Sequence, residues 1–230
     1  ADDEWVETEE GSEEGVQIDQ YEITATPNDF NVMTIGSYLD VGAIVLPMFQ
    51  RNFTWDKARA SKLIESLILG LPVPQIFLYE EEKNKFLILD GQQRLMSIYF
   101  FTKGRFPKPH KRSFLRSLLI EQGSIPDEVL HDNEHFQNFN VALPKRDDQR
   151  KSPFEGLNYK TLSDYRTAFD LRPLRVVIIK QNEPREDNSS IYEIYDRLNT
   201  GGVNLKPQEI RANLYSSSFY RMIYGINQDD

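Results

Sequence analysis

The stretch Ile88-Leu89-Asp90-Gly91-Gln92-Gln93-Arg94-Leu95 decides how this chain folds, because an apolar run ends there and a polar turn leads into a helical pattern. The preceding residues, Phe86–Leu89, have the length and composition of a buried strand. After the turn, Leu95, Ile98 and Tyr99 recur at the spacing of a helix face. The sequence therefore predicts a strand that turns directly into a helix.

The turn itself, residues 90–94, has two compatible interpretations. In the first, Asp90 caps the helix, Gln93 completes a capping box and Gly91 relieves a tight turn. In the second, a glycine before a helix N-terminus exposes backbone N–H groups that bind an anion. Gln92 and Gln93 would add amide donors, Arg94 a forked cation suited to phosphate, and Asp90 a ligand for a metal ion.

Upstream of the turn, the sequence predicts one helix and one further strand. Apolar residues recur at helical spacing over about residues 55–69, between Thr54 as a candidate cap and Gly70 as a stop. A strand over about Gln75–Tyr79 follows. It is joined to the strand of the turn through the charged connection Glu80–Lys85.

Downstream, the pattern is mixed. Residues of about 105–160 are broken by prolines and predict a helical or loop-rich insertion. Leu174–Lys180, "LRVVIIK", is a Val/Ile run too short for a helix and predicts a buried strand. A helix is expected from Ser190 to the glycine turn Asn199–Gly202, and another opens at Pro207. Strands and helices without regular alternation indicate an α+β fold, with a short mixed sheet flanked by helices.

Charge is distributed unevenly along the 230 residues. The first 20 residues hold nine acidic residues and no Lys or Arg, which predicts an acidic, disordered tail. Removing these nine from the 36 acidic residues leaves 27, equal to the 27 basic residues, so residues 21–230 are neutral. The net charge of -9 therefore does not argue against contact with nucleic acid.

Composition also excludes several classes of function. The chain has no cysteine, which rules out disulfides, thiolate metal sites and cysteine nucleophiles. The N-terminal residues lack the basic and apolar regions of a signal peptide. No apolar run reaches the ~20 residues of a membrane helix. We therefore expect a cytoplasmic protein without a membrane partner.

Two more polar stretches lie where predicted elements join. In Pro47–Trp55, "PMFQRNFTW", Gln50 and Arg51 stand among aromatic residues. Either the aromatics fill the core while Arg51 pairs with a carboxylate, or the loop contacts a base and a phosphate. In Arg197–Leu214, a polar glycine turn separates two predicted helices, and a helix stop followed by a restart is the favoured interpretation.

Four motifs together carry a resemblance to a known family. In order and spacing, the chain resembles the N-terminal domain of GmrSD-type modification-dependent restriction proteins over about residues 21–215. The motifs are "LPMFQRNFTW" (Leu46–Trp55), "LIESLILGLPVPQIFLY" (Leu63–Tyr79), "ILDGQQRLMSIYFF" (Ile88–Phe101) and "IYDRLNTGGVNLKPQEIR" (Ile194–Arg211). The resemblance implies a core related to the ParB and sulfiredoxin folds, and thus one nucleotide-binding domain over 21–230. In this family it also implies binding and hydrolysis of a nucleoside triphosphate with Mg²⁺, coupled to DNA restriction.

The resemblance also assigns site residues. Asp90 and Arg94 are the expected catalytic residues, with Asp90 also holding Mg²⁺ through the phosphates. We expect Arg51 and Arg94 to converge on one cleft, with Glu209 as a neutralising partner. The expected nucleotide-binding residues are Gln50, Arg51, Gly91, Gln92, Gln93, Asn199, Gly201, Gly202, Glu209 and Arg211.

The resemblance further suggests partners and limits the activity. Implied partners are a nucleoside triphosphate, DNA in the complete protein, and a nuclease domain or subunit. Many family members continue into an HNH nuclease, whose metal-binding histidines have no counterpart among the three histidines here. We therefore expect a nucleoside triphosphatase that regulates DNA cleavage done elsewhere. The alternative is a DNA- or protein-binding module that the nucleotide switches without turnover.

Two other stretches, His131–His135 and residues 103–116, have compositions found in metal sites and in DNA-binding surfaces. His131–His135, "HDNEH", fits the H-x-x-E-H zinc protease pattern, but five residues match easily by chance and a solvated surface is favoured. The stretch 103–116 holds six Lys or Arg and no acid, and we weigh DNA-backbone contact there against a solvated face. The DNA-contact candidates are Lys103, Arg105, Lys108, Lys111 and Arg112.

Overall fold

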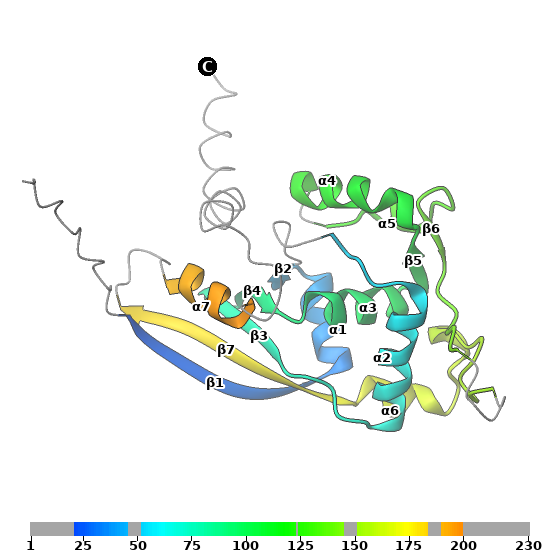
Figure 1. Cartoon of the computed structure of the whole chain (residues 1–230), viewed down its shortest axis with the longest axis horizontal. Coiled ribbons are helices and arrows are strands. Elements are labelled where there is room, and N and C mark those ends of the chain that lie inside the picture. Colours follow the sequence, from blue (N-terminus) through cyan, green and yellow to red (C-terminus); the bar gives the residue numbers. More distant parts are fainter. Residues whose placement is uncertain (1–20, 46–51, 123, 145–150, 184–189, 200–230) are drawn as a thin grey trace, which may run out of the picture.

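The structure is a computed structural model that describes residues 21–45, 52–122, 124–144, 151–183 and 190–199 (Figure 1). A five-stranded sheet with the order β1-β7-β3-β4-β2 forms its centre. These strands are β1 (Glu22–Asn31), β2 (Ile44–Val45), β3 (Ile76–Glu82), β4 (Lys85–Asp90) and β7 (Pro173–Glu183).

The sheet is mixed. β1 pairs with β7 and β3 with β4 in antiparallel fashion, whereas β3 with β7 and β2 with β4 are parallel. The three strands predicted from sequence are β3, β4 and β7, each somewhat longer than expected. β1 and β2 were not predicted. Most of β1 is exposed along an edge of the sheet, so its sequence lacks the alternation that marks a half-buried strand.

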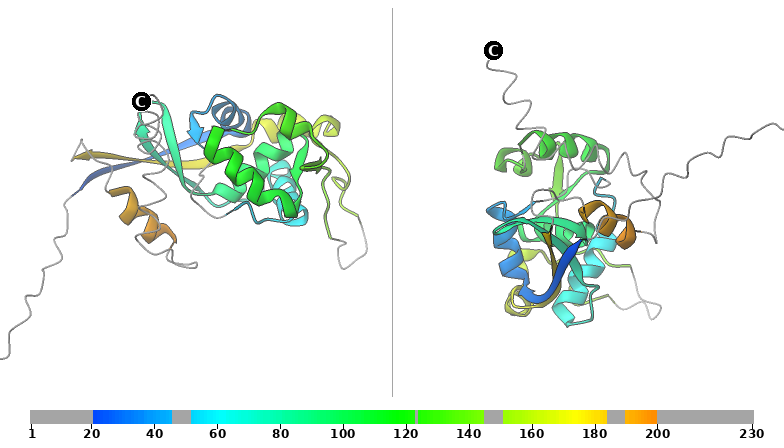
Figure 2. Two further views of the ribbon diagram at one scale, coloured as in Figure 1. Left: turned by 90° about the horizontal axis from the view of Figure 1, so that it is seen from above. Right: turned by 90° about the vertical axis from the view of Figure 1, so that its left-hand side faces the viewer.

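Both faces of β4 are buried, which explains its continuous apolar run. Phe86 and Ile88 face one hydrophobic core, and Leu87 and Leu89 face a second, as the alternation of a strand requires. The first core is covered by α1 (Val32–Asp40), α2 (Lys57–Leu69), α3 (Gln92–Thr102) and α6 (Tyr165–Asp170), and the second by α7 (Ser190–Asn199) (Figure 2). The predicted α+β class, with a short mixed sheet between helices, is confirmed.

The boundaries of α2 show which sequence signals were correct. Gly70 ends the helix as expected, in the left-handed conformation (φ 77°). The predicted cap, Thr54, is wrong, because Asp56 occupies the N-cap and accepts a hydrogen bond from the Arg59 N–H at 2.7 Å. Arg172 lies over Gly70 and donates to the Leu67 carbonyl at 2.7 Å, so it stabilises the C-terminal end of α2.

The region between α3 and α6 contains short elements and one unexpected feature. Its helices are η1 (Pro109–Lys111), α4 (Arg112–Gln122), α5 (Asp127–His131) and η2 (Tyr159–Thr161). A small antiparallel sheet of β5 (Arg105–Pro107) and β6 (Phe136–Asn138) was not predicted. Phe106, Phe136 and Phe139 are buried in the first core, so this region packs into the main body. None of the described helices is long and apolar enough to span a membrane.

Candidate functional site

The turn between β4 and α3 depends on Gly91. Its φ of 100° is left-handed, and it occupies the N-cap of α3, for which no described side chain supplies a capping hydrogen bond. A Cβ atom on Gly91 would also lie 2.9 Å from Cγ1 of Ile76. Backbone angle and close packing therefore both require glycine. The first-turn N–H groups of α3 have no acceptor within the helix, as at any helix start.

Asp90 lies one residue before the N-cap, and the predicted capping box is wrong. Since Gly91 takes the cap position, the Asp90 carboxylate accepts not from a backbone N–H of the first turn but from the Arg94 side chain, with Oδ2 2.8 Å from Nη2. Nη2 of Arg94 also donates to the carbonyl of Gln75 at 3.1 Å. The Arg94 side chain is only 15% exposed, whereas that of Asp90 is 44% exposed.

Arg94 is incompletely satisfied. In the described part of the chain, its Nε atom is buried and has no hydrogen-bond acceptor. A buried donor of this kind costs free energy unless something outside the described residues accepts from it. The guanidinium group is thus held in place on one side and has donor capacity left over.

The two glutamines of the turn point into the protein. Gln93 Oε1 accepts from the N–H groups of Thr54 at 2.8 Å and Trp55 at 3.2 Å, and Nε2 donates to the Asn52 carbonyl at 3.2 Å. Gln92 is only 8% exposed, and its Nε2 lies 3.6 Å from Sδ of Met96. Their assignment as nucleotide-binding residues stays a prediction, in which a ligand would meet their backbone N–H groups.

Most candidate residues of the first and fourth motifs lie outside the described residues: Gln50, Arg51, Gly201, Gly202, Glu209 and Arg211. Asn52, which belongs to the first motif, is held against α3 by Gln93. Asn199 is the last described residue of α7. At the start of that helix, the Ser190 N–H donates a hydrogen bond to Oε1 of Gln181 at 3.0 Å. The helix then runs towards the end of the sheet at which α3 starts (Figures 1 and 2). The neutralising partner of Arg94 among the described residues is Asp90.

Comparison with known protein families matches residues 31–216 to the family described as GmrSD restriction endonuclease, N-terminal domain. The match covers well over half of the 230 residues. The chain belongs to this family. The family predicted from the four motifs is thereby confirmed, and the match extends over α3, the turn and every strand of the sheet except β1. Comparisons with curated proteins and with solved structures gave no match, so the relation of the core to ParB and sulfiredoxin stays a prediction.

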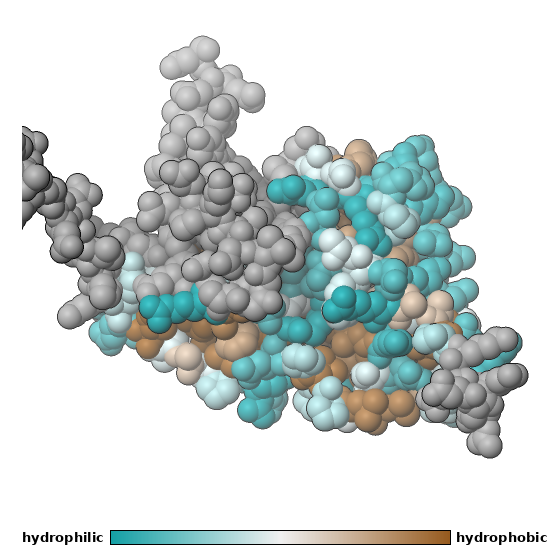
Figure 3. Space-filling model, in the orientation of Figure 1, coloured by the Kyte–Doolittle hydropathy of each residue, from teal (hydrophilic) through white to brown (hydrophobic). Residues whose placement is uncertain are grey.

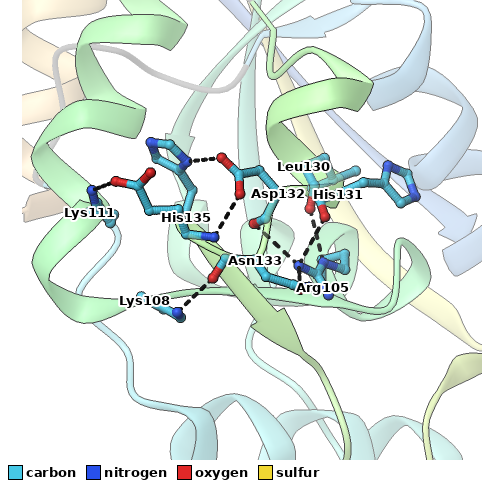
Figure 4. A network of polar contacts seen from close by, with 9 residues as sticks. Arg105, Lys108, Lys111, Leu130, His131, Asp132, Asn133 and His135 are labelled. Carbon is cyan, nitrogen blue, oxygen red and sulfur yellow. Dashed lines mark hydrogen bonds and ion pairs between the residues drawn. The ribbon is translucent and has the colours of Figure 1, made fainter.

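Arg105, one of the DNA-contact candidates in this GmrSD-family domain, is buried. It is 8% exposed, and its Nε donates to the Leu130 carbonyl at 2.9 Å. Nη1 donates at 2.8 Å to Oδ1 of Asn138, and Nη2 donates at 2.8 Å to Oδ1 of Asn133 (Figure 4 shows Arg105 beside Asn133). The guanidinium group joins β5 to the turn after α5 and is directed away from solvent. Its assignment as a DNA contact is therefore corrected to a structural role.

The other basic candidates also have partners within the chain. Those partners make each side chain less available to a phosphate, but Lys108 and Lys111 lie near the surface beside the turn that follows α5 (Figure 4). The contacts are Lys103 with Asp40 at 2.6 Å, Lys108 with the Asn133 carbonyl at 2.6 Å, Lys111 with Glu134, and Arg112 with the Trp55 carbonyl at 2.8 Å.

The "HDNEH" stretch does not form a zinc protease helix. His131 is the last residue of α5 and His135 follows a turn, so they do not share a helix face. Asp132, Glu134 and His135 do place possible ligand atoms within 4.8 Å of one another. However, Asp132 accepts from His135 Nδ1 at 2.8 Å, and Lys111 pairs with Glu134 and lowers its pKa (Figure 4). These contacts support the favoured interpretation, a polar surface network.

A cavity of about 280 Å³ lies away from the chemistry of the turn. It is lined by the connection from α2 to β3 and by the first residues of β7. Leu69, Leu71 and Leu171 are about half exposed near it, and Figure 3 shows hydrophobic surface where α2 ends. The Arg175 side chain in its wall is neutralised by Asp29 at 2.6 Å. The cavity is therefore better suited to apolar contacts than to binding a charged ligand.

Proposed function

We propose that this GmrSD-family domain binds a nucleoside triphosphate and hydrolyses it, and so regulates DNA cleavage by a nuclease domain or subunit outside this chain. The observation that carries the proposal is the N-terminus of α3, which follows a left-handed glycine and has no side-chain cap among the described residues. A helix start that follows a glycine presents backbone N–H groups and a partial positive charge to one point. Phosphate oxygens are its natural ligands.

Arg94 adds the charge that the reaction requires. Its guanidinium group lies in the first turn of α3, is mostly buried, and keeps a buried Nε without an acceptor in the described part of the chain. A fixed cation at low dielectric stabilises negative charge that develops on a phosphoryl group. We assign Arg94 this catalytic role.

Asp90 fits the role of a Mg²⁺ ligand. Its carboxylate is 44% exposed, and only Oδ2 is engaged by Arg94. Mg²⁺ in nucleotide sites is usually held by one or two carboxylates together with substrate phosphates, and it would neutralise charge on those phosphates. Asp90 would orient the ion, while Arg94 and the α3 N–H groups bind the phosphate oxygens.

The first and fourth motifs complete the site in this proposal. The Gln93 contacts to Asn52 and Trp55 support a position of the first motif beside the turn. The direction of α7 supports a position of the fourth motif at the same end of the sheet. The residues proposed to contact the nucleotide are Gln50, Arg51, Gly91, Gln92, Gln93, Asn199, Gly201, Gly202, Glu209 and Arg211.

DNA is the proposed macromolecular partner of the complete protein. The half-buried lysines Lys103, Lys108 and Lys111 are the proposed backbone contacts, because an ammonium group near the surface can exchange a carboxylate or a carbonyl partner for a phosphate at little cost. Arg105 is excluded from this role by its burial.

Two measurements on the purified chain test the proposal. Thermal unfolding with each nucleoside triphosphate and Mg²⁺ should show stabilisation, since a ligand that binds only the folded state raises the unfolding temperature. Phosphate release should then be measurable with the nucleotide that stabilises most. Arg94→Ala should abolish both effects and keep the fold. A wild-type chain that no triphosphate stabilises would refute the proposal.

A second function is favoured by the state of Gln93. A glutamine amide is one of the groups that orient the attacking water in nucleoside triphosphatases. Here that amide is occupied by the backbone of Asn52, Thr54 and Trp55. The domain would then bind the nucleotide as a switch for DNA or protein binding, without turnover. Stabilisation by a triphosphate without phosphate release would select this alternative.

A further inference from the structure

The segment 52–56 contains the last four residues of the first motif, leads into α2 and has no regular secondary structure. Its backbone groups therefore lack the partners that a helix or a strand pair would supply. Within it, Phe53 is buried in the first core and contacts the rings of Phe100 and Phe106 edge to face. The position of the segment depends on that ring and on side chains that bind its backbone.

Gln93 binds this backbone from α3. Its single side-chain amide accepts from two consecutive N–H groups, those of Thr54 and Trp55, and donates to the carbonyl of Asn52. Both ends of the amide are thus used on residues about 40 positions earlier in the chain. An amide is suited to this because it combines an acceptor and a donor in one plane.

Arg112 binds the same segment from α4. Its Nη2 donates to the Trp55 carbonyl at 2.8 Å, and its guanidinium carbon lies 5.3 Å from the centre of the Phe53 ring. The peptide groups on both sides of Trp55 are thus held by two different helices. Burial lowers the pKa of Arg112, and the nearby Asp56 carboxylate partly opposes this. The Arg112 side chain is half-buried, and its bond to the Trp55 carbonyl makes it less available to a DNA backbone.

We propose that Gln93 and Arg112 are positioning residues that clamp segment 52–56 against the start of α3 and thereby fix the first motif beside the turn. An effect of this clamp on catalysis rests on the proposed nucleotide hydrolysis. The contacts that hold segment 52–56 in place do not depend on it. Gln93, expected to bind the nucleotide, and Arg112, expected to contact DNA, thus act through the protein backbone. Within the turn itself, the groups left to touch phosphate are the Arg94 side chain and the backbone N–H groups.

Hydrogen exchange of the full chain tests the clamp directly. Gln93→Leu should speed exchange of the Thr54 and Trp55 amides at least about fivefold, because each loses its hydrogen-bond acceptor. Gln93→Glu keeps an acceptor oxygen for both amides, although it loses the donation to the Asn52 carbonyl, and should restore most of the protection. The matched control is Gln181→Leu, which removes a glutamine acceptor from the N–H of Ser190 at the start of α7. It should leave the two amides unchanged.

Tryptophan fluorescence provides a second readout that does not need a nucleotide. The chain has two tryptophans, Trp5 and Trp55, so Trp5→Phe isolates Trp55. In this background, Gln93→Leu and Arg112→Met should each increase quenching of Trp55 by iodide. Gln181→Leu should not. If neither the quenching nor the exchange of segment 52–56 changes, the clamp is wrong.

Turnover separates positioning from a merely structural role. If the segment carries the first motif to the nucleotide, Gln93→Leu should lower kcat by about tenfold or more, while KM changes less. Gln93→Glu should recover part of the loss. Faster exchange with unchanged kcat would overturn the positioning role. A wild-type chain that hydrolyses no triphosphate would refute the proposed function, and the exchange experiment would still decide the clamp.

Discussion

Nη2 of Arg94 lies 2.8 Å from Oδ2 of Asp90, so one ion pair joins the end of β4 to the first turn of α3. A phosphate that binds Arg94 must therefore compete with the Asp90 carboxylate. Asp90→Asn removes this competitor, and we expect it to raise the affinity for a triphosphate without Mg²⁺ by about three- to tenfold. With Mg²⁺ present, turnover should fall, because the proposed metal ligand is lost.

A second ion pair of the same spacing offers a control. Arg166 and Asp170 lie on α6 at 3.5 Å, also four residues apart. Asp170→Asn removes a carboxylate from an arginine in the same way and should change neither nucleotide binding nor turnover. Titration by calorimetry, with and without Mg²⁺, measures both variants. An Asp90→Asn protein that binds metal-free triphosphate no better than wild type would contradict the competition between Asp90 and phosphate.

Gly91 should be more sensitive to substitution than Gly104, another left-handed glycine. Gly91 and Gly104 both have positive φ, but a Cβ on Gly104 meets no atom within 4 Å, whereas one on Gly91 lies 2.9 Å from Ile76. Gly104→Ala should cost about 1 kcal/mol of unfolding free energy, from backbone strain alone. Gly91→Ala adds the collision with a buried side chain and should cost about 2–4 kcal/mol. Urea unfolding measures both, and equal costs would contradict the packing argument.

Much of the central fold could be predicted because its signals are local. Three strands, α2, α3 and the start of α7 follow from apolar periodicity and glycine stops, and all are present. β1 escaped prediction because its residues are largely exposed and its partner, β7, is about 150 residues away in sequence. Pairing between residues so far apart is not marked by any local periodic pattern in the sequence. β5 and β6 have three residues each, too few for an alternating pattern to be recognised in the sequence.

In the turn, the sequence predicted the residue types of a helix start but not the partners of its side chains. Asp90, Gly91 and Gln93 match a capping box by residue type, but a left-handed glycine at the cap moves the helix start by one residue. Asp90 then pairs with Arg94, and Gln93 binds segment 52–56. The composition of the turn predicted an anion-binding helix start. The side-chain partners depended on packing between distant elements, which no local pattern contains.

Tyr99 should make stability depend on pH in the alkaline range. It is 8% exposed, and burial raises its pKa to about 12, with smaller contributions from Asp40 and Asp127. Since the unfolded tyrosine has a pKa near 10, the folded chain retains a proton that the unfolded chain has lost. The stabilisation is full below about pH 10 and is lost as pH rises towards 12. The loss should amount to about 2–3 kcal/mol.

Tyr99→Phe isolates this effect. The variant has no hydroxyl to titrate, so its unfolding free energy should fall less steeply between about pH 10 and 12 than that of wild type. Denaturant unfolding at several pH values measures the difference, and the difference ultraviolet spectrum of the two proteins follows the ionisation itself. Parallel stability curves for both proteins would show that Tyr99 titrates normally.

Arg105 and Lys108 are three residues apart in the same basic stretch and should differ in what they do. Arg105→Met leaves the Leu130 carbonyl and two asparagine side chains without a buried donor, and should cost about 3 kcal/mol or more. Lys108→Met removes one surface contact and should cost less than about 1 kcal/mol.

DNA binding should reverse that order. If Lys108 contacts a phosphate, Lys108→Met should weaken DNA binding for all sequences and reduce the slope of log affinity against log salt by about one. Arg105→Met, measured at a temperature where it is fully folded, should keep the wild-type slope, because its guanidinium group faces the protein. Thermal unfolding together with binding at several salt concentrations tests both residues. A reduced slope for Arg105→Met would mean that this arginine leaves its buried position to bind DNA, and would overturn the structural role assigned to it.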